Sequence, residues 1–395
     1  MNPELELLHP YPFEKIRVLL DGITPVDKTP IALSIGEPKH AAPQFVLDAL
    51  VDKLRTIETY PSTKGSDTLR ESIANWLSKR FQLDNAETLA SKHILPVNGT
   101  REALFAIAQC VLDRSQANRD VLMPNPFYQI YEGAALLAGC RPSFYNISAQ
   151  CDDDINAITD AQFDACQLFY LCNPGNPTGS VLSQATLTAL IERAHKHNFV
   201  IVSDECYSEI YRKEAGAPTG LLQAAQAMGN TEYSQCLVFH SLSKRSNLPG
   251  LRSGFVAGDS DIIEKFLLFR TYHGCSMSPP VQHASAIAWG DEEHVVQNRT
   301  AYDEKYDAVM TLLKPVMAVD TPPAGFYLWP TLPVDDEQFT KDMFAHHNVR
   351  LVPGSYLGRT VNGENPGAMH VRMALVAPLE ECVDAANRIV ALLSA

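Results

Sequence analysis

The chain has 395 residues, of which 46% are hydrophobic and 20% charged, so it has the length of two or three domains and the composition of a globular protein. Its 46 acidic and 32 basic residues give a formal net charge of -14, which argues against broad binding to nucleic acids or to anionic membranes. An anionic ligand therefore needs a local cluster of cations.

In chain order, amphipathic helices alternate with short apolar strands between about residues 100 and 260. The stretches TREALFAIAQCVLD and ATLTALIERAHKH carry apolar residues at helical spacing. The runs DVLMP, QLFYLCNP, FVIVSDE and CLVFHSLS are continuously apolar, which is typical of strands buried on both faces of a mainly parallel sheet. We predict an α/β fold with helices on both faces of the sheet.

The C-terminal section has a different pattern. The runs GFYLWP, VRLVPGSYLG and MHVRMALVAP indicate alternating strands among helical stretches, which favours a smaller α+β domain. We expect a large domain over residues 41–289, and a small domain formed by residues 290–395 together with the N-terminal arm, residues 1–40.

Two features bear on the cellular compartment. The nine cysteines include no CxxC pair, and Cys166, Cys172, Cys206 and Cys236 lie in apolar runs, which favours buried reduced thiols over disulfides or a zinc site. The N-terminal sequence MNPELELLHPYPFEK lacks the basic and apolar regions of a signal peptide, and no apolar run is long enough to span a bilayer. We expect a cytoplasmic protein without a membrane segment.

Polar residues follow three of the predicted strands. Asn173 and Asn176 follow QLFYLC, Asp204 ends FVIVSD, and Ser241 to Lys244 follow CLVFH. Ligands of such sheets bind beyond the carboxyl ends of the strands, so these residues predict one shared site.

Lys244 has two interpretations. A lysine in such a loop is commonly a solvated surface charge, but an unprotonated amine can also condense with an aldehyde to form a Schiff base. Ser241, Ser243 and Arg252 supply hydroxyls and a fixed cation, a set suited to phosphate. Together these residues indicate an aldehyde that carries a phosphate, namely pyridoxal phosphate.

Asp204 in SDECY would need a partner if it were buried, and a protonated pyridine nitrogen is a suitable one. The alternative is an N-cap for a following helix. Tyr207 and Asn176 could both donate hydrogen bonds to the phenolate oxygen of such a ring, although the prolines and glycines of NPGNPTG make a fixed turn in any case.

Two further motifs fit an anion and a planar ring. NGTREALF opens a helix at a glycine turn, so the backbone N–H groups of Gly99, Thr100 and Arg101 would face an anion, with the Thr100 hydroxyl as a further donor or as a helix cap. In NPFYQIY, Phe127 and Tyr128 are either core aromatics or a stacking surface for a planar ring.

Arg372 interrupts the apolar strand HVRMALV and serves either in an internal salt bridge or as a bidentate clamp for a carboxylate. The histidines give no metal site: His195 and His197 do not share a helix face, and the pair His346 and His347 lacks a third ligand.

An ordered set of motifs along essentially the whole chain resembles the pyridoxal-phosphate-dependent aminotransferases of the class I/II family. The matching stretches are LSIGEP, TYPSTKG, NGTRE, NPFYQIY, NPGNPTG, SDECY, SLSK, GLRSGF and VRMAL. The resemblance implies the aspartate aminotransferase fold, a homodimer with shared active sites, and ping-pong transfer of an amino group between amino-acid and 2-oxo-acid substrates.

The resemblance also implies a role for each matching residue. Lys244 would be the Schiff-base lysine and general base, and Asp204 the partner of the pyridine nitrogen. Asn176 and Tyr207 would bind the ring oxygen, Tyr128 would stack on the ring, and Gly99, Thr100, Arg101, Ser241, Ser243 and Arg252 would hold the phosphate. Arg372 would bind the substrate α-carboxylate, Gly36 would lie on the substrate side, and Tyr60 would reach the phosphate of the partner subunit.

Longer stretches, among them LSIGEPKH, NPFYQIYEGAA, FHSLSKRSNLPGLRSGFVAGD and RTYHGCSM, are similar to the proteobacterial N-succinyl-L,L-diaminopimelate aminotransferases of lysine biosynthesis. This similarity implies N-succinyl-L,L-2,6-diaminopimelate and 2-oxoglutarate as substrates. Lys39 and Lys64 are candidates for binding the distal carboxylates of this substrate, because they lie near Gly36 and Tyr60 in the sequence.

Three other functions are compatible with the same motifs. They are another amino-acid aminotransferase, a β-lyase on the same scaffold, and a transcription regulator with an aminotransferase-like sensing domain. The acidic charge, and a family pattern that begins at PYPFEK near residue 10, argue against the regulator.

Overall fold

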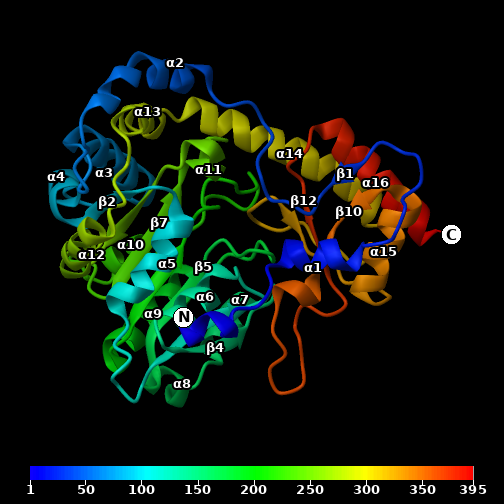
Figure 1. Cartoon of the computed structure of the whole chain (residues 1–395), viewed down its shortest axis with the longest axis horizontal. Helices are drawn as coiled ribbons and strands as arrows, with labels where there is room; N and C mark the ends of the chain where they lie inside the picture. The colour runs from blue at the N-terminus through cyan, green and yellow to red at the C-terminus, as the bar shows by residue number, and fades with distance from the viewer. Residues whose placement is uncertain (395) are drawn as a thin grey trace.

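A seven-stranded sheet forms the centre of the larger part of the molecule in the computed structural model, which describes residues 1–394 (Figure 1). One strand, β8, runs antiparallel to both of its neighbours, and all other neighbouring strands are parallel. This mainly parallel, mixed sheet confirms the predicted α/β fold. In spatial order the strands are β2 (Ile94–Val97), β8 (Gly254–Gly258), β7 (Cys236–Ser241), β6 (Val200–Asp204), β5 (Cys166–Cys172), β3 (Asp120–Asn125) and β4 (Arg141–Asn146).

Helices cover both faces of this sheet. Successive side chains of a strand point to opposite faces, so neighbouring residues of one strand pack in different cores. In β5, Phe169 and Leu171 belong to one hydrophobic core, and Leu168 and Tyr170 belong to the other. The first core includes residues of α3 (Asp67–Phe81), α9 (Gln184–His197), α10 (Leu221–Ala227) and α13 (Pro279–Gly290). The second includes residues of α5 (Thr100–Val111), α6 (Ile130–Leu137) and α12 (Ser260–His273). Two buried faces explain why the strand segments are continuously apolar.

Helix α9 shows how the local sequence determines an element. Its N-cap Ser183 accepts a hydrogen bond from the Thr186 N–H group over 3.2 Å, which satisfies one free donor of the first turn. The predicted apolar positions, including Leu187 and Ile191, are buried on one side. The helix ends where Asn198 adopts a left-handed conformation with φ of 56°.

The predicted strand CLVFHSLS is shorter in the structure. Strand β7 ends at Ser241, and the short helix α11 (Leu242–Arg245) follows directly. The Ser241 hydroxyl caps this helix by accepting a hydrogen bond from the Ser243 N–H group over 3.1 Å. Lys244 is therefore held on a helical turn immediately beyond the carboxyl end of a central strand.

The C-terminal part contains two small sheets packed against helices (Figure 1). In one sheet the order is β11 (Val352–Pro353), β12 (Val371–Ala374) and β9 (Tyr327–Leu328), all antiparallel. In the other, β1 (Ile31–Ala32) of the N-terminal segment pairs in parallel with β10 (Val349–Arg350). The third hydrophobic core joins β1, β9, β10 and β12 to α14 (Glu293–Leu313), α15 (Asp336–His347) and α16 (Leu379–Leu393), whereas Val352 of β11 belongs to a separate small cluster.

The remaining elements are short. The α-helices are α1 (Pro12–Leu19), α2 (Gln44–Asp52), α4 (Ala86–Thr88), α7 (Cys151–Asn156) and α8 (Asp160–Asp164). The 3-10 helices are η1 (Pro3–Leu7), η2 (Leu54–Glu58), η4 (Pro249–Leu251) and η5 (Gly354–Leu357), and η3 (Leu89–His93) is a π-helical turn.

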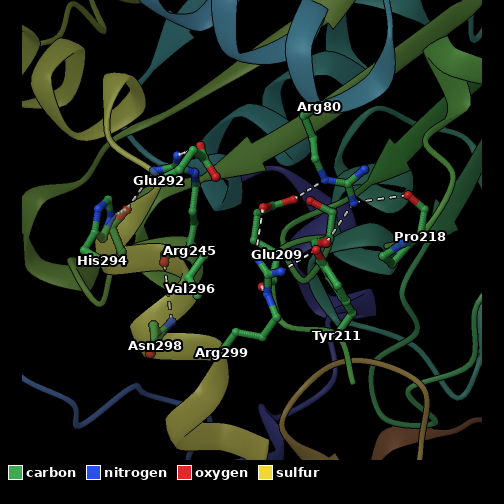
Figure 2. A network of polar contacts seen from close by, with 12 residues as sticks. Arg80, Glu209, Tyr211, Pro218, Arg245, Glu292, His294, Val296, Asn298 and Arg299 are labelled. Atoms are coloured by element: carbon green, nitrogen blue, oxygen red, sulfur yellow. Dashed lines mark hydrogen bonds and ion pairs between the residues drawn. The ribbon is translucent and has the colours of Figure 1, made fainter. Parts of the chain in front are cut away.

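Helix α14 extends from the large sheet to the C-terminal part (Figure 1). Near its beginning, Arg299 lies 3.8 Å from the buried carboxylate of Glu209, which also binds Arg80 of α3 over 2.6 Å (Figure 2). Glu292, just before the helix, pairs with Arg245 of α11 (Figure 2). Its C-terminal half packs in the third core. The two parts of the molecule are thus joined by one continuous helix that is anchored at both ends.

Within residues 1–394 no helix is both long and apolar enough to cross a membrane. All nine cysteines are free, and Cys166, Cys206 and Cys236 are buried as predicted. Cys172 is only half-buried, because it is the last residue of β5 and borders a small hollow beside Asn176.

Candidate active site

A cavity of about 580 Å³ lies at the carboxyl ends of the central strands. Asp204 at the end of β6 is in register with Cys172 of β5 and Phe239 of β7, so the segments that follow these strands meet at one edge of the sheet. Twelve of the predicted site residues line the cavity. They are Gly36, Thr100, Arg101, Tyr128, Asn176, Asp204, Tyr207, Ser241, Ser243, Lys244, Arg252 and Arg372.

Lys244 reaches into this cavity from α11. Its Nζ donates a hydrogen bond to the carbonyl of Gly36 and lies 5.1 Å from the centre of the Phe326 ring. Desolvation by the surrounding protein lowers the pKa of Lys244 to about 8. The residue is therefore not a solvated surface charge, and about a tenth of its amine is unprotonated at pH 7, far more than for a lysine in water.

Asp204 is buried, with 5% of its surface exposed. Its Oδ2 accepts a hydrogen bond from the Tyr131 hydroxyl over 2.8 Å, and its Oδ1 accepts one from the Cys206 N–H group over 3.3 Å. Burial raises the pKa of Asp204. The N-cap alternative is wrong, because the chain turns after Asp204 and the next helix begins only at Leu221.

Three predicted ring contacts lie around the same space. The Tyr128 hydroxyl accepts a hydrogen bond from Arg101 Nε over 2.5 Å, and the Tyr207 hydroxyl lies 3.1 Å from that of Tyr327. Burial raises the pKa of Tyr207 well above its usual value, so its hydroxyl keeps a proton to donate. Asn176 contributes its side-chain oxygen to Arg372.

The predicted anion subsite lies at the beginning of α5. Gly99 is its N-cap residue, with φ of 83°, a backbone conformation that favours glycine. A Cβ atom at Gly99 would lie 2.2 Å from Nη2 of Arg252, so only glycine allows this arginine to approach the turn. The Thr100 hydroxyl lies 3.1 Å from the Cys206 sulfur and also lines the cavity. Gly99 thus shapes the subsite from behind, without lining it.

Arg372 lies in β12 and is buried, with 7% of its surface exposed. It donates to the carbonyl of Ser34 over 2.9 Å and to the side-chain oxygen of Asn176 over 3.2 Å, while its Nε is buried without a hydrogen-bond partner. Both acceptors are uncharged, so the internal salt bridge considered above is not what these contacts form. The guanidinium keeps its charge available for an anionic ligand.

Three predicted residues lie elsewhere on the chain. Tyr60 is fully exposed in a separate surface hollow that also contains Ser276 and Ser278, so one chain does not bring it to the cavity. Lys64 is exposed on a turn, and Lys39 Nζ lies 3.7 Å from the Glu381 carboxylate. Neither lysine is among the residues that line the cavity. Proximity in the sequence was therefore a poor guide for these two lysines.

Several residues of the site were not predicted from the sequence. Tyr131 holds Asp204, Tyr327 meets Tyr207, and Glu37 and Tyr11 line the cavity. Tyr131 ends the motif NPFYQIY, three residues after Tyr128. This spacing, which brings side chains together on one side of a helical turn, could have indicated that Tyr131 lies near the site. Tyr11 carried no comparable signal, because it belongs to an N-terminal segment far from the sheet in sequence.

Comparisons with known proteins agree with this architecture. The sequence model described as "Aminotransferase class I and II" matches residues 28–389. A crystal structure of an aminotransferase from Neisseria meningitidis is 44% identical, with a TM-score of 0.94 over 100% of both chains. An LL-diaminopimelate aminotransferase from Maridesulfovibrio salexigens is 27% identical over 98% of this chain and 97% of its own.

A third relative is a probable N-succinyldiaminopimelate aminotransferase from Thermus thermophilus, which is 26% identical, with a TM-score of 0.83 over 97% of this chain and 100% of its own. The family match spans most of the chain and includes every residue of the cavity named above except Tyr11. The chain belongs to the class I and II aminotransferases, a family of pyridoxal-phosphate-dependent enzymes.

Proposed function

We propose that this aminotransferase binds pyridoxal phosphate in the cavity through Lys244. The observation that carries the proposal is a desolvated lysine, with a pKa of about 8, in the same cavity as a buried carboxylate and two available arginines. Asp204 suits a protonated pyridine nitrogen, because a buried carboxylate is stabilised by a cationic partner. Arg252 and the first turn of α5 suit a phosphate. The donor set therefore fits the cofactor at both ends.

The bound cofactor would supply an electron sink for the negative charge that develops at the substrate Cα. Lys244 would offer its amine for covalent attachment of the cofactor. Once the substrate amine has replaced it there, the freed Lys244 amine would move the proton at the substrate Cα as general base. Asp204 would stabilise a proton on the ring nitrogen, and Tyr131 keeps the Asp204 carboxylate in place by its hydrogen bond. Arg372 binds the α-carboxylate and thereby orients the Cα–H bond toward Lys244.

For the substrates we propose N-succinyl-L,L-2,6-diaminopimelate and 2-oxoglutarate, in a ping-pong reaction that serves lysine biosynthesis. The Thermus thermophilus relative with that substrate in its name supports the proposal, as do the motifs described above. Unacylated L,L-diaminopimelate is a second candidate, because the Maridesulfovibrio salexigens relative is named for it. The Glu37 carboxylate in the cavity would also attract a free distal ammonium group.

The proposal includes a homodimer in which Tyr60 enters the partner's site, and a cytoplasmic location. The full exposure of Tyr60 supports such an intersubunit role, since a tyrosine side chain exposed to this degree gains nothing from its own chain. We also propose the division into a large domain over residues 41–289 and a small domain formed by residues 1–40 and 290–395. The separate hydrophobic core of the C-terminal part supports it.

The substrate is tested by measuring glutamate formation from 2-oxoglutarate with N-succinyl-L,L-diaminopimelate, L,L-diaminopimelate or other amino acids as donor. The proposal expects the highest kcat/KM for the succinylated donor. A higher value for the free diamine would favour the second candidate, and release of pyruvate and ammonia from a cysteine conjugate would identify a β-lyase. A Lys244→Ala variant that retained most of the activity would refute the role of Lys244.

A further inference from the structure

Lys305 is a buried lysine that the function proposed above does not use. It lies on α14 with 2% of its surface exposed, and it binds two uncharged acceptors. Its Nζ lies 2.6 Å from His40 Nε2 and 3.4 Å from the carbonyl of Val376. A buried ammonium group without a carboxylate contact lowers the stability of the fold. We therefore expect a role of Lys305 other than stabilisation.

His40 connects this lysine to Asn298 on the same helix. Its Nδ1 lies 2.7 Å from the Asn298 side-chain oxygen. Asn298 and Lys305 are seven residues apart, so they lie on one face of α14 with the His40 ring between them. The Tyr302 ring on this face lies 4.6 Å from the ring of His40, centre to centre. The half-buried histidine thus contacts three side chains of one helix.

The hydrogen bonds of this group all run in one direction. A lysine ammonium only donates, so His40 Nε2 accepts, and the neutral imidazole must carry its proton on Nδ1. Nδ1 then donates to the Asn298 side-chain oxygen, to which Asn247 also donates over 3.0 Å. The Asn298 amide nitrogen donates in turn to the backbone carbonyl of Lys244 over 3.4 Å. It also donates to the backbone carbonyl of Arg245 over 3.4 Å (Figure 2).

His40 is connected to Lys244 in two ways, through Asn298 and through the backbone that leads to Gly36. Asn298 holds its backbone carbonyl, and His40 belongs to the same segment as Gly36, whose carbonyl accepts the hydrogen bond from Lys244 Nζ. The segment that His40 anchors also includes Ser34, whose carbonyl binds Arg372. The backbone of residues 34–40 therefore connects His40 to the acceptors of both the amine and the arginine of the site.

We propose that His40 and Lys305 are positioning residues for Lys244. With Asn298, they hold the Gly36 segment and α11 in a fixed relation on one face of α14. The inference rests on the role proposed above for Lys244. Neither His40 nor Lys305 contacts the reacting atoms in this arrangement, because both act through the Gly36 segment and the Lys244 backbone.

The surroundings keep His40 in the neutral form that the chain requires. Burial, and then the charge of Lys305, lower the pKa of His40, against the opposing effect of the hydrogen bond to Asn298. Burial lowers the pKa of Lys305 to about 8. The other groups that face the pair are Tyr302 of α14, Cys382 of α16, and Lys39, which lies 3.7 Å from Glu381. Protonation of His40 would place two cations side by side, so His40 keeps a single proton.

The test compares four variants. His40→Leu removes both hydrogen bonds of the ring, and His40→Gln, of similar volume, retains one donor and one acceptor. Lys305→Met removes the first donor, and Lys314→Met is the control, because Lys314 is exposed just beyond the end of the same helix. For each apoprotein, the rate of pyridoxal phosphate uptake is followed by visible absorbance as a function of pH, and kcat is measured on the holoenzyme.

In the parent protein the uptake rate should rise with pH to a midpoint near 8, where Lys244 loses its proton. His40→Leu and Lys305→Met should lower this midpoint by about one pH unit, because the ammonium form loses the ordered Gly36 acceptor. Both should lower kcat about 10-fold. His40→Gln should keep most of the parent values of the pH midpoint and of kcat, and Lys314→Met should change neither.

An unchanged midpoint in both His40→Leu and Lys305→Met would overturn the inference, as would a His40→Gln variant as impaired as His40→Leu. Because two residues are changed independently, a failure of one variant to fold leaves the other as the test. Nitrogen-15 spectra of the histidines give a further check, since a proton on His40 Nε2 in place of Nδ1 would contradict the direction of the chain. If Lys244→Ala still bound the cofactor covalently, the proposed function itself would fail, whatever the His40 variants do.

Discussion

Replacement of Lys244 by methionine should stabilise the cofactor-free protein at neutral pH, although it removes the proposed reactive group. Burial, together with the nearby charges of Arg372 and Arg101, lowers the pKa of Lys244 from 10.5 to about 8. At about 1.4 kcal/mol per pKa unit, folding with a protonated Lys244 costs about 3 kcal/mol. Methionine has no such cost, but it loses the hydrogen bond to the Gly36 carbonyl, worth about 1 kcal/mol. We expect a net gain of about 2 kcal/mol at pH 7.

The sign of the pH dependence follows from the lowered pKa of the folded state. The cost is fully present below pH 8, where the amine is protonated in both states, and it disappears as the pH approaches 10.5 and both states hold a neutral amine. The advantage of Lys244→Met should therefore fall from about 2 kcal/mol at pH 7 to about zero near pH 10.

Urea unfolding of the apoproteins, followed by circular dichroism at one protein concentration, measures this difference at both pH values. Lys314→Met is the matched control, because its exposed lysine has nothing to gain from the change. A Lys244→Met variant less stable than its parent at pH 7 would contradict the expected cost of the buried ammonium group. An advantage of the same size at pH 7 and pH 10 would contradict it equally.

Three further predictions concern the site. Tyr131→Phe removes the donor to Asp204 and should lower kcat/KM about 10-fold in steady-state kinetics, whereas an unchanged value would show that the carboxylate does not depend on it. Arg372→Lys keeps the charge but loses the two-pronged grip, so KM for the amino donor should rise about 10- to 100-fold at unchanged cofactor content, which absorbance reports. Tyr60→Ala and Lys244→Ala chains, each impaired alone, should regain up to about a quarter of the parent activity when refolded together, since one site of each mixed dimer would carry neither change. No recovery on mixing would contradict a shared site.

The large sheet and its helices could be predicted from the sequence, because a strand buried on both faces and a helix packed on one side leave distinct patterns over a few residues. The same held for the positions of Asp204, which ends an apolar strand, and of Lys244, which comes three residues after one. The end of β7 was harder to predict, since Ser241 can either continue a strand or cap a helix. Only its hydrogen bond with the Ser243 N–H group shows that it caps a helix.

Other features depend on residues far apart in the chain, for which a single sequence gives no pattern. The contact between His40 and Lys305 joins residues 265 positions apart. The pairing of β1 with β10 brings together two strands of two residues each, too short for a period to be visible. Lys39 shows the converse difficulty, because its neighbour Gly36 lies at the cavity while its own side chain reaches toward Glu381. Closeness along the chain does not fix the direction of a side chain.

The distribution of the site along the chain has a consequence for its synthesis on the ribosome. The cavity combines Gly36 from the N-terminal segment, Lys244 from the middle and Arg372 from the last strand. The seven-stranded sheet has all its strands once residue 258 has been made, whereas the arginine for the carboxylate comes only with β12. Because such non-local contacts form late, a nascent chain would hold the amine before it holds the group that orients a substrate. Cofactor capture and substrate recognition would then appear in that order during biogenesis, and a ribosome stalled between them would carry a chain able to do only the first.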